Sequence, residues 1–296
     1  MADEKKEEEL FLEGGRIAHI ALKAGEKSIK KGAKLMDVTE TVEKKIKDEG
    51  GELAFPVNIS QNERAAHYTC SINDESVFGS DVVKLDVGAQ VNGYIGDNAL
   101  TVDLTGKHAK LVKASEDALD VAVKMIAPGV NNIDVGTKIE EVIEKAGFKP
   151  IENLSGHVIK QNILHCGLSI PNVGRGMEFE IEEGMIIAIE PFASMGRGRV
   201  TNEKHTEIFG LEEVKPVRNK DARKLLEYVA ENQPFLPFSE RSLSSICSGF
   251  RLKVALKELV TKGVFESYPV LRDDGLVSQA ENTVLVTSDG CEVTTK

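Results

Sequence analysis

The stretch Lys84-Leu85-Asp86-Val87-Gly88, followed by Asn92-Gly93 and then by Tyr94-Ile95-Gly96-Asp97-Asn98, predicts the centre of the fold. Asn-Gly between two alternating segments is the strongest short-range signal for a β-hairpin, because both residues tolerate the positive φ that a two-residue turn requires. The sequence therefore predicts two antiparallel strands that are joined at Asn92 and Gly93.

In this register Gly88 lies opposite Asp97, and Asp86 lies opposite Ala99. Strand alternation then places the two aspartates on one face of the hairpin, diagonal to each other. Two carboxylates in an apolar strand context repel each other unless a cation lies between them or they share a proton. The hairpin therefore suggests a metal site. For these two residues alone, a pair of ordinary aspartates that face solvent is an equally open interpretation.

Three further side chains with the chemistry of metal ligands stand in apolar surroundings. A neutral imidazole such as that of His157 is a common ligand of divalent transition metals. Glu190 ends the apolar run 185–189, where an unpartnered carboxylate would be costly, and Glu281 stands just before the apolar run 284–286. The alternatives are a hydrogen-bonded core histidine and two satisfied carboxylates at strand ends.

Helical patterns precede the hairpin and recur after it. Apolar residues recur at helical spacing over residues 10–31, and a second stripe begins at Asp37, which forms a capping-box-like pair with Glu40. Residues 111–126 form another apolar helix, and Asp134 is expected to cap the helix that follows it.

The two helix pairs match at a constant offset of 97 residues. The matching positions are Gly32 and Gly129, Asp37 and Asp134, Val38 and Val135, Glu43 and Glu140, and Gly50 and Gly147. Their order predicts an internal, pseudo-twofold duplication of an α-α-β unit. Two related halves usually face each other, so that a site between them can draw ligands from both.

Strand-like segments follow the helix pairs, at residues 82–87, 94–104 and 185–189. This order indicates an α+β fold. Residues 197–267 change to a mostly helical and charged sequence, and strand-like sequence returns at Tyr268. We therefore expect a catalytic domain formed by residues 1–196 and 268–296, with residues 197–267 as an inserted helical subdomain.

The composition argues against several classes of protein. The chain has 296 residues, 41% of them hydrophobic, and its net charge of −11 does not suit a surface that neutralises nucleic-acid phosphates. No apolar run approaches the roughly 20 residues that span a bilayer, and the charged residues 1–9 do not resemble an export signal. The 4 cysteines lack a C-x-x-C spacing, as expected of reduced thiols. We expect a cytoplasmic protein that binds neither DNA nor a membrane.

Taken together, these residues resemble the methionine aminopeptidases. Asp86, Asp97, His157, Glu190 and Glu281, in this order and in these local contexts, are similar to the dinuclear metal ligand set of that family. The resemblance extends to Phe55-Pro56-Val57-Asn58-Ile59-Ser60, to Asn62, to Ala65-Ala66-His67-Tyr68, to His165-Cys166-Gly167 and to Ile189-Glu190-Pro191-Phe192. The inserted segment is similar to the winged-helix-like subdomain of type II enzymes, and the short N-terminus resembles the archaeal form. The resemblance implies the pita-bread fold of creatinase and the aminopeptidases.

The resemblance also implies an activity. It is the hydrolytic removal of the initiator methionine from nascent proteins, with a preference for a small second residue. The cofactors would be two divalent ions of cobalt, manganese, iron or zinc, which activate a bridging water or hydroxide. Asp97 would chelate one ion and His157 the other, while Asp86 and Glu281 would span or anchor both.

By the same resemblance, four residues would act on the substrate. Glu190, itself a ligand, would also move a proton from the nucleophile to the leaving amine. His67 and His165 would hold the substrate and stabilise the oxyanion. Phe55 would line the pocket for the methionine side chain. The alternative role of the two histidines is core packing.

Two rival functions share this architecture. A prolyl dipeptidase would cleave before proline, but the type II-like insertion and residues 65–68 disfavour it. A non-catalytic binding protein, similar to the proliferation-associated relatives, would have lost metal ligands, whereas all five are present here. We expect a monomer whose partners are peptide and protein N-termini and, transiently, the ribosome.

Overall fold

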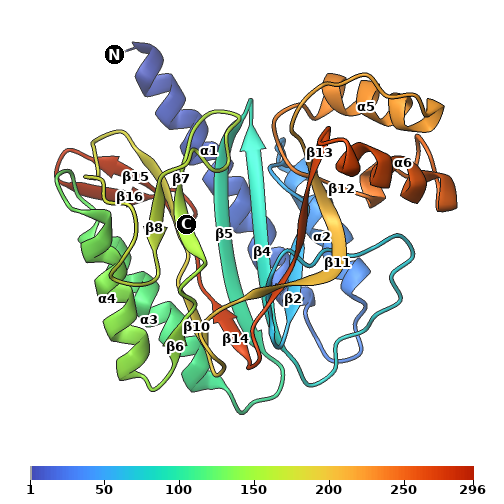
Figure 1. Cartoon of the computed structure of the whole chain (residues 1–296). Helices are drawn as coiled ribbons and strands as arrows, with labels where there is room; N and C mark the ends of the chain where they lie inside the picture. Colours follow the sequence, from blue (N-terminus) through green and yellow to red (C-terminus); the bar gives the residue numbers. More distant parts are fainter. Residues whose placement is uncertain (1) are drawn as a thin grey trace.

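The computed structural model describes the backbone of residues 2–296 and the side chains from residue 5 onward. The helices among these residues are α1 (Ala2–Ser28), α2 (Leu35–Asp48), α3 (Ala109–Met125), α4 (Asn132–Lys145), α5 (Lys220–Asn232) and α6 (Gly249–Thr261), with a short 3-10 helix η1 (Arg241–Leu243). The first strands are β1 (Glu52–Leu53), β2 (Asn58–Gln61), β3 (Arg64–Ala66), β4 (Val82–Val91), β5 (Tyr94–Asp103), β6 (Lys149–Pro150), β7 (Ser155–Ile159) and β8 (Ser169–Pro171). The later strands are β9 (Ile186–Ile189), β10 (Phe192–Ser194), β11 (Thr201–Leu211), β12 (Phe238–Ser239), β13 (Phe265–Arg272), β14 (Val277–Gln279), β15 (Asn282–Thr287) and β16 (Gly290–Val293). This mixture of helices and strands, which Figure 1 shows along the chain, confirms the α+β class.

The hairpin of β4 and β5 has the predicted register. Gly88 pairs with Asp97, and Asp86 pairs with Ala99. The turn residues Asn92 and Gly93 have φ values of 53° and 85°, as the two-residue turn requires. The local signal was sufficient here because the turn fixes the register of both strands.

The helix pairs confirm the internal duplication. Both bounds of α2, shifted by 97 residues, coincide with those of α4. The glycines that precede these helices, Gly32 and Gly129, have φ values of 81° and 84°. Those that follow them, Gly50 and Gly147, have φ values of 86° and 89°. The two halves therefore share backbone conformations that residues other than glycine rarely adopt.

The predicted caps of α2 and α4 are wrong. The residue that caps α2 is Lys34, without a side-chain hydrogen bond, and that of α4 is Asn131, whose side chain accepts a bond from the Ile133 N–H. Asp37 and Asp134 instead lie in the first turn, where a negative charge still favours the helix dipole. The helices begin earlier because loop carbonyls accept bonds from their first N–H groups, as Ser76 and Phe179 do for Leu35 and Asn132.

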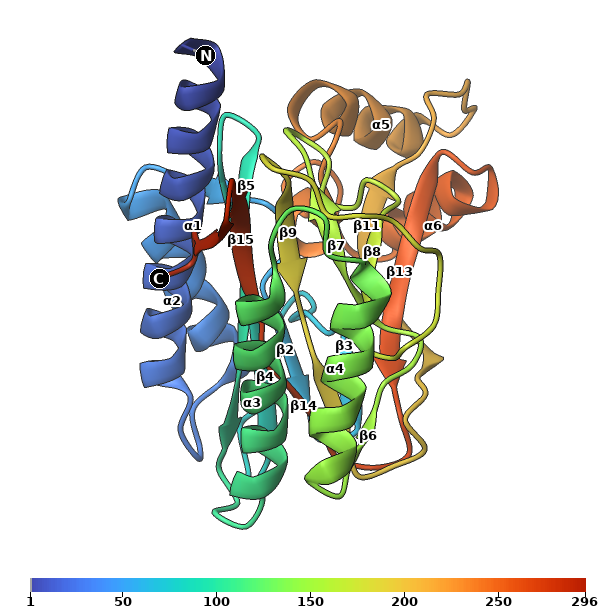
Figure 2. The same ribbon diagram turned by 90° about the vertical axis from the view of Figure 1, so that its left-hand side faces the viewer.

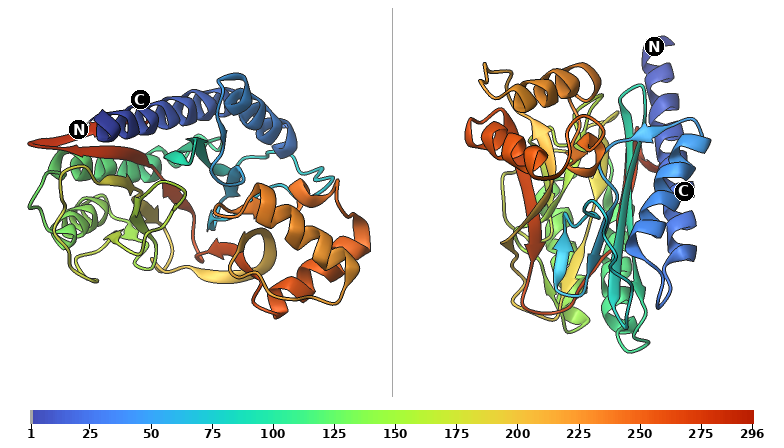
Figure 3. Two further views of the ribbon diagram at one scale, coloured as in Figure 1. Left: turned by 90° about the horizontal axis from the view of Figure 1, so that it is seen from above. Right: turned by 90° about the vertical axis from the view of Figure 1, so that its right-hand side faces the viewer.

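The helix pairs lie outside the strands (Figures 2 and 3). α1 packs against β4 and β5 on one side and against α2 on the other, and their common core includes Ile17, Val42 and Leu85. α3 and α4 pack against strands of the second half, in a core that includes Leu111 and Ile139. Within the described part of the chain, no helix combines the length and the hydrophobicity that a bilayer crossing requires.

The strands form four small sheets among the described residues. The hairpin sheet has the order β1-β4-β2, with β5 on β4, and the sheet of the second half has the order β16-β15-β9-β7-β8. The others have the orders β14-β10-β6 and β12-β11-β13-β3. The last of these sheets connects the inserted segment to the first half through β13: β13 pairs with β11 of the segment and, at Leu271, with Ala66 of β3.

The inserted segment is less helical than its sequence suggested. It has its own core, which includes Leu225, Leu252 and Phe265. However, β11 has 11 residues and pairs with β13 along most of its length. The first seven residues of β11, 201–207, are polar and lack the apolar alternation that marks a half-buried strand. Pairing with a partner distant in sequence therefore decided the conformation.

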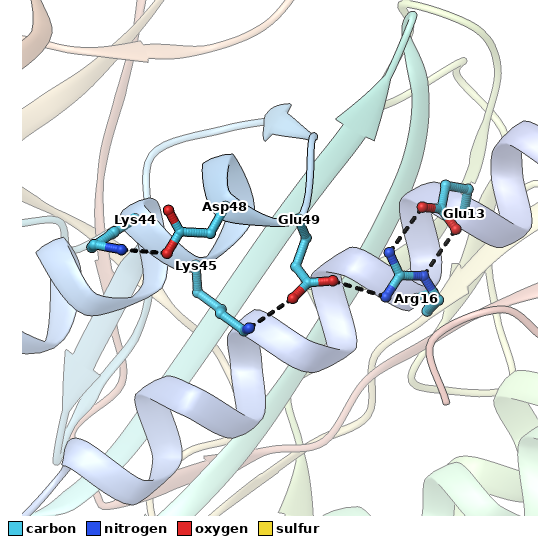
Figure 4. Close-up of polar contacts among 6 residues, drawn as sticks. All are labelled: Glu13, Arg16, Lys44, Lys45, Asp48 and Glu49. Atoms are coloured by element: carbon cyan, nitrogen blue, oxygen red, sulfur yellow. Dashed lines mark hydrogen bonds and ion pairs between the residues drawn. The ribbon is translucent and has the colours of Figure 1, made fainter.

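Ion pairs connect α1 to the end of α2 (Figure 4). Arg16 contacts Glu13 at 2.8 Å and Glu49 at 3.0 Å, and Lys45 contacts Glu49 at 2.7 Å. Such exposed pairs contribute little because water and salt screen them. The buried side chain of Ile46, in the same helix turn, therefore contributes more to the position of α2.

Candidate metal centre

The five predicted ligands stand on elements of both halves. Asp86 lies in β4, Asp97 in β5 and His157 in β7, whereas Glu190 follows β9 and Glu281 precedes β15. All five line one cavity of about 340 Å³. The structure thus brings together side chains that are far apart in the sequence.

Reciprocal hydrogen bonds join the two halves at this cavity. The Ala99 N–H donates to the Glu281 carbonyl at 3.3 Å, and the Glu281 N–H donates to the Ala99 carbonyl at 3.0 Å. The Thr283 hydroxyl donates to the Asp97 carbonyl at 2.8 Å, and the Asp97 N–H donates to Thr283 Oγ1 at 2.9 Å. These bonds hold the backbones of Asp97 and Glu281, which belong to different halves, in a fixed relation.

Three of the side chains form a tight group. One potential ligand atom from each of Asp97, His157 and Glu281 lies within 4.8 Å of the other two. His157 Nε2 is 3.5 Å from Asp97 Oδ2 and 4.0 Å from Glu190 Oε1. The three residues of the tight group are buried, whereas Asp86 and Glu190 keep part of their surface open. Nitrogen and oxygen donors so arranged suit a divalent transition metal.

Burial and mutual repulsion dominate the electrostatics of the cavity. Burial raises the pKa of Asp97 to about 8. The pKa values of Asp86, Glu190 and Glu281 are also raised well above their usual range, first by burial and then by the negative charges of neighbouring carboxylates. Burial lowers the pKa of His157 to about 4, so its imidazole is neutral. Without a cation, four ionised carboxylates would be unstable here.

The cavity therefore fits divalent metal ions. Asp86 Oδ1 and Asp97 Oδ1 are buried and have no hydrogen-bond partner among the described residues. Buried carboxylate oxygens without a partner are costly, and a metal ion satisfies them directly. A neutral imidazole completes a donor set that binds manganese, iron, cobalt or zinc.

The two other predicted histidines line the same cavity. His67 follows β3 with a φ of 64°, uncommon for a residue other than glycine, and its Nδ1 lies 3.3 Å from the Pro269 carbonyl. The His165 ring is perpendicular to that of His157, and the ring centroids are 4.1 Å apart. Burial lowers the pKa of His67 to about 4 and that of His165 to about 3. Both imidazoles are neutral, with one N–H each. That of His67 donates from Nδ1 to the Pro269 carbonyl, so its Nε2 can accept a hydrogen bond from a ligand, whereas His165 can donate one.

Phe55 also lines the cavity, and its position depends on a glycine. A Cβ atom added at Gly88 would collide with the Phe55 ring. Gly88 faces Asp97 across the hairpin, so the ring lies directly against the strand that carries Asp86. The absence of a side chain at Gly88 lets an apolar surface border the acidic cluster.

Several lining residues received no role from the sequence. Tyr268 and Ile208 come from β13 and β11, and Asn58 lies opposite Asp86 in the neighbouring strand. Gln279, buried beside the cavity, hydrogen-bonds to two of the acids. Asn58 lies within a matched motif and Gln279 lies two residues before Glu281, which is a weak signal. Tyr268 and Ile208 carried none, because they reach the cavity only through the pairing of β11 with β13.

Comparisons with known proteins agree with this geometry. The family model described as metallopeptidase family M24 matches residues 9–288. The chain is 46% identical to a methionine aminopeptidase of Methanocaldococcus jannaschii, over 97% of this chain and 98% of that protein. The crystal structure of a methionine aminopeptidase from Thermotoga maritima is similar, with a TM-score of 0.72 and 25% identity over 98% of this chain and 97% of that one. A prolidase from Pyrococcus furiosus shares the fold at a TM-score of 0.64 and 21% identity, over 99% of this chain and 64% of the prolidase. These neighbours confirm the pita-bread fold.

Proposed function

The chain belongs to the methionine aminopeptidases of metallopeptidase family M24, and from this premise we propose that Asp86, Asp97, His157, Glu190 and Glu281 bind its catalytic metal ions. Membership makes the protein a metal-dependent hydrolase that removes N-terminal methionine. The observation that carries the assignment is the convergence of four carboxylates and one imidazole on one cavity. Divalent cations would balance the charge of these carboxylates, which burial otherwise favours in their protonated form.

We propose that two ions are bound. Four carboxylates carry four negative charges, which two divalent cations neutralise, whereas one ion would leave half of that charge unbalanced. Asp97 would hold one ion and His157 the other, and Asp86 and Glu281 would be available to both. Manganese, iron, cobalt and zinc all suit this oxygen-rich set.

The chemistry divides between the ions and the side chains. When bound, divalent ions would supply two effects: a lowered pKa of the attacking water and polarisation of the scissile carbonyl. Glu190, which lies at the more open side of the cluster, accepts the proton of the attacking water and delivers it to the leaving amine. His67, whose Nδ1–H donates to the Pro269 carbonyl, holds the substrate by accepting a hydrogen bond from a substrate N–H at Nε2. The neutral imidazole of His165 donates a hydrogen bond to the developing oxyanion.

The substrate is a polypeptide with a free N-terminal methionine. We propose that its side chain packs against the ring of Phe55, since a thioether packs well on aromatic surface. A cavity of about 340 Å³ that must also hold the metal ions leaves little room beyond the first residue. This supports a preference for a small second residue.

The prolyl dipeptidase remains the nearest alternative, because a prolidase shares the fold. The comparison is made with Met-Ala-Ser and Ala-Pro as substrates. The proposal requires cleavage of the first and not of the second. Preferential cleavage of Ala-Pro would replace it.

The test of the site compares the wild type with His157→Ala and Glu190→Gln. Bound metal is measured by elemental analysis, and turnover is measured on Met-Ala-Ser. We expect both variants to lose most activity and His157→Ala to retain less metal. Unchanged turnover in both variants would refute the site assignment.

Three proposals concern the whole protein. We propose that residues 197–267 form the inserted subdomain and residues 1–196 and 268–296 the catalytic domain. We further propose a monomer that acts in the cytoplasm and contacts the ribosome transiently, where new N-termini emerge. A ribosome pelleting assay tests this contact, and absence of the protein from the pellet at low salt would refute it.

A further inference from the structure

Gln279 is buried beside the cavity and has no part in the proposed chemistry. It ends β14, is 1% exposed and pairs with Phe192 of β10. Thr101 of β5 fixes its backbone from the other side. The Gln279 N–H donates to Thr101 Oγ1 at 2.9 Å, and the Thr101 hydroxyl donates to the Gln279 carbonyl at 2.7 Å. Elements of both halves therefore determine where its side chain lies.

The side-chain amide of Gln279 reaches two of the proposed ligands. Its Nε2 lies 3.2 Å from Glu281 Oε2 and 3.5 Å from Asp86 Oδ2. The reverse orientation would place Gln279 Oε1 against two carboxylate oxygens, so the N–H groups must face the acids. In the part of the chain that the structure describes, no other hydrogen-bond donor reaches either carboxylate.

We propose that Gln279 is a positioning residue that orients Asp86 and Glu281 for the binding of divalent ions. The inference rests on the metal-binding role proposed above. A carboxylate can rotate about its bond to the chain, and a donor to one of its oxygens fixes its plane while the other oxygen stays free. In agreement, Asp86 Oδ2 faces Gln279, and Asp86 Oδ1 has no hydrogen-bond partner among the described residues.

The two N–H groups of one amide serve two acids from different strands. Asp86 lies in β4, and Glu281 lies between β14 and β15. Gln279 thus couples the orientation of the two ligands that are assigned to both ions. Loss of such an outer partner typically weakens metal binding by about 10–100-fold.

The test measures Mn²⁺ affinity by calorimetry on the full chain after metal removal. Gln279→Leu keeps the size of the side chain and removes both donors, and Gln279→Met does the same without branching. We expect the Kd for Mn²⁺ to rise about 10–100-fold in both variants. A Kd within threefold of the wild-type value in either folded variant would overturn the proposal.

Ser278→Ala is the matched control. Ser278 is equally buried in β14, but its hydroxyl donates to the Leu111 carbonyl at 2.8 Å, away from the acids. This variant should lower the Tm and leave the Kd unchanged. An equal loss of Mn²⁺ affinity in Ser278→Ala would mean that β14 packing, and not the Gln279 amide, sets the affinity.

Activity separates a positioning role from a catalytic one. At saturating Mn²⁺, Gln279→Leu should regain turnover of Met-Ala-Ser within severalfold of the wild type, while at limiting Mn²⁺ it should not. Turnover that stays low at saturation would overturn the positioning role.

Asp86→Asn distinguishes failure of the Gln279 proposal from failure of the proposed metal centre. If Asp86→Asn loses Mn²⁺ and Gln279→Leu does not, only the Gln279 inference fails. If Asp86→Asn also retains Mn²⁺, the metal centre itself fails.

Discussion

Asp97 shows what a buried acid costs when its partner is absent. Burial raises its pKa to about 8, and two hydrogen bonds through Thr283 prevent its backbone from moving away. The side chain can avoid the cost only by taking up a proton or by binding a cation. Stability and metal content of this protein are therefore linked.

This linkage gives a pH dependence with a definite sign. The pKa of Asp97 is about 8 in the folded protein and about 3.9 in an unfolded chain. Since it is raised on folding, it contributes stability at low pH that is lost as the pH rises through 8. The buried histidines act oppositely, but only below about pH 6.5, where an unfolded histidine gains its proton. Buried Lys84, whose pKa is lowered to about 7, acts oppositely above pH 7, but the four acids with raised pKa values outweigh it. From pH 6.5 to pH 8.5, we expect the Tm in EDTA to fall.

Thermal unfolding followed by circular dichroism checks this expectation. Saturating Mn²⁺ should abolish the fall, because bound cations favour the ionised carboxylates. Asp97→Asn should reduce the slope in EDTA, since the variant lacks the titrating group. A Tm in EDTA that is constant or rises over this range contradicts the explanation.

Gly88→Ala tests whether the position of the Phe55 ring beside the acidic cluster matters for substrate binding. The new Cβ would displace the Phe55 ring, so the KM for Met-Ala-Ser should rise by about tenfold. Overpacking should also cost about 1–3 kcal/mol of stability. Gly290→Ala is the control, because a Cβ at that position meets nothing within 4 Å. Equal KM values in the two variants would exclude a role of Phe55 in binding the substrate.

Single residues could be placed from the sequence where local interactions determine their position, and could not where contacts with distant residues determine it. Asn92 and Gly93 fixed a register of ten residue pairs, because the signal is local. The candidate ligands stood out because acids and a histidine in apolar runs need partners. Tyr268 and Gln279 could not be assigned from the sequence. Their positions at the cavity depend on contacts with strands that only the folded chain brings near.

At the level of helices and strands, contacts between distant parts of the chain prevailed over local signals. The helices α2 and α4 begin before the predicted caps because the Ser76 and Phe179 carbonyls accept hydrogen bonds from the N–H groups of Leu35 and Asn132. The polar strand β11 formed because β13 paired with it. Periodicity therefore predicted the existence of the helices, and tertiary contacts decided their ends and the conformation of the inserted segment.

Two substitutions, one in α2 and one at its C-cap, compare the contribution of buried apolar contacts with that of ion pairs. Ile46→Ala removes a side chain that is 0% exposed and should destabilise the protein by about 2–5 kcal/mol. Glu49→Gln removes the charge that pairs with Arg16 and Lys45 in Figure 4 and should have a much smaller effect, which disappears at 1 M salt. Denaturant titration measures both. A larger loss in Glu49→Gln would show that the ion pairs hold α2.

In the molecule as a whole, the cavity is the place where the two duplicated halves meet. Asp86 and Asp97 come from the first half, and His157, Glu190 and Glu281 come from the second. The duplication could be predicted from the sequence because glycines, which have positive φ in the structure, recur at its turns. The sheet that joins β3 to the inserted segment could not be predicted, since no local pattern indicates a pairing between residues 66 and 271.

Hydrogen exchange tests whether metal ions stabilise this junction. Mn²⁺ should slow exchange of the Ala99 and Glu281 amides, which are bonded across the halves, because opening there would release the ions. The amides of α5, remote from the ligands and with a core of their own, should exchange at an unchanged rate. Mass spectrometry of peptic fragments measures both regions. Equal protection of α5 would indicate a global effect instead.

The division of the ligands between the halves has a practical consequence. A gene severed between codons 104 and 108, after β5 and before α3, would encode two polypeptides, each with an incomplete set of ligands. Each would be silent alone, and mixing them would restore hydrolysis. The protein thus lends itself to a complementation reporter whose signal requires both fragments and the metal at once.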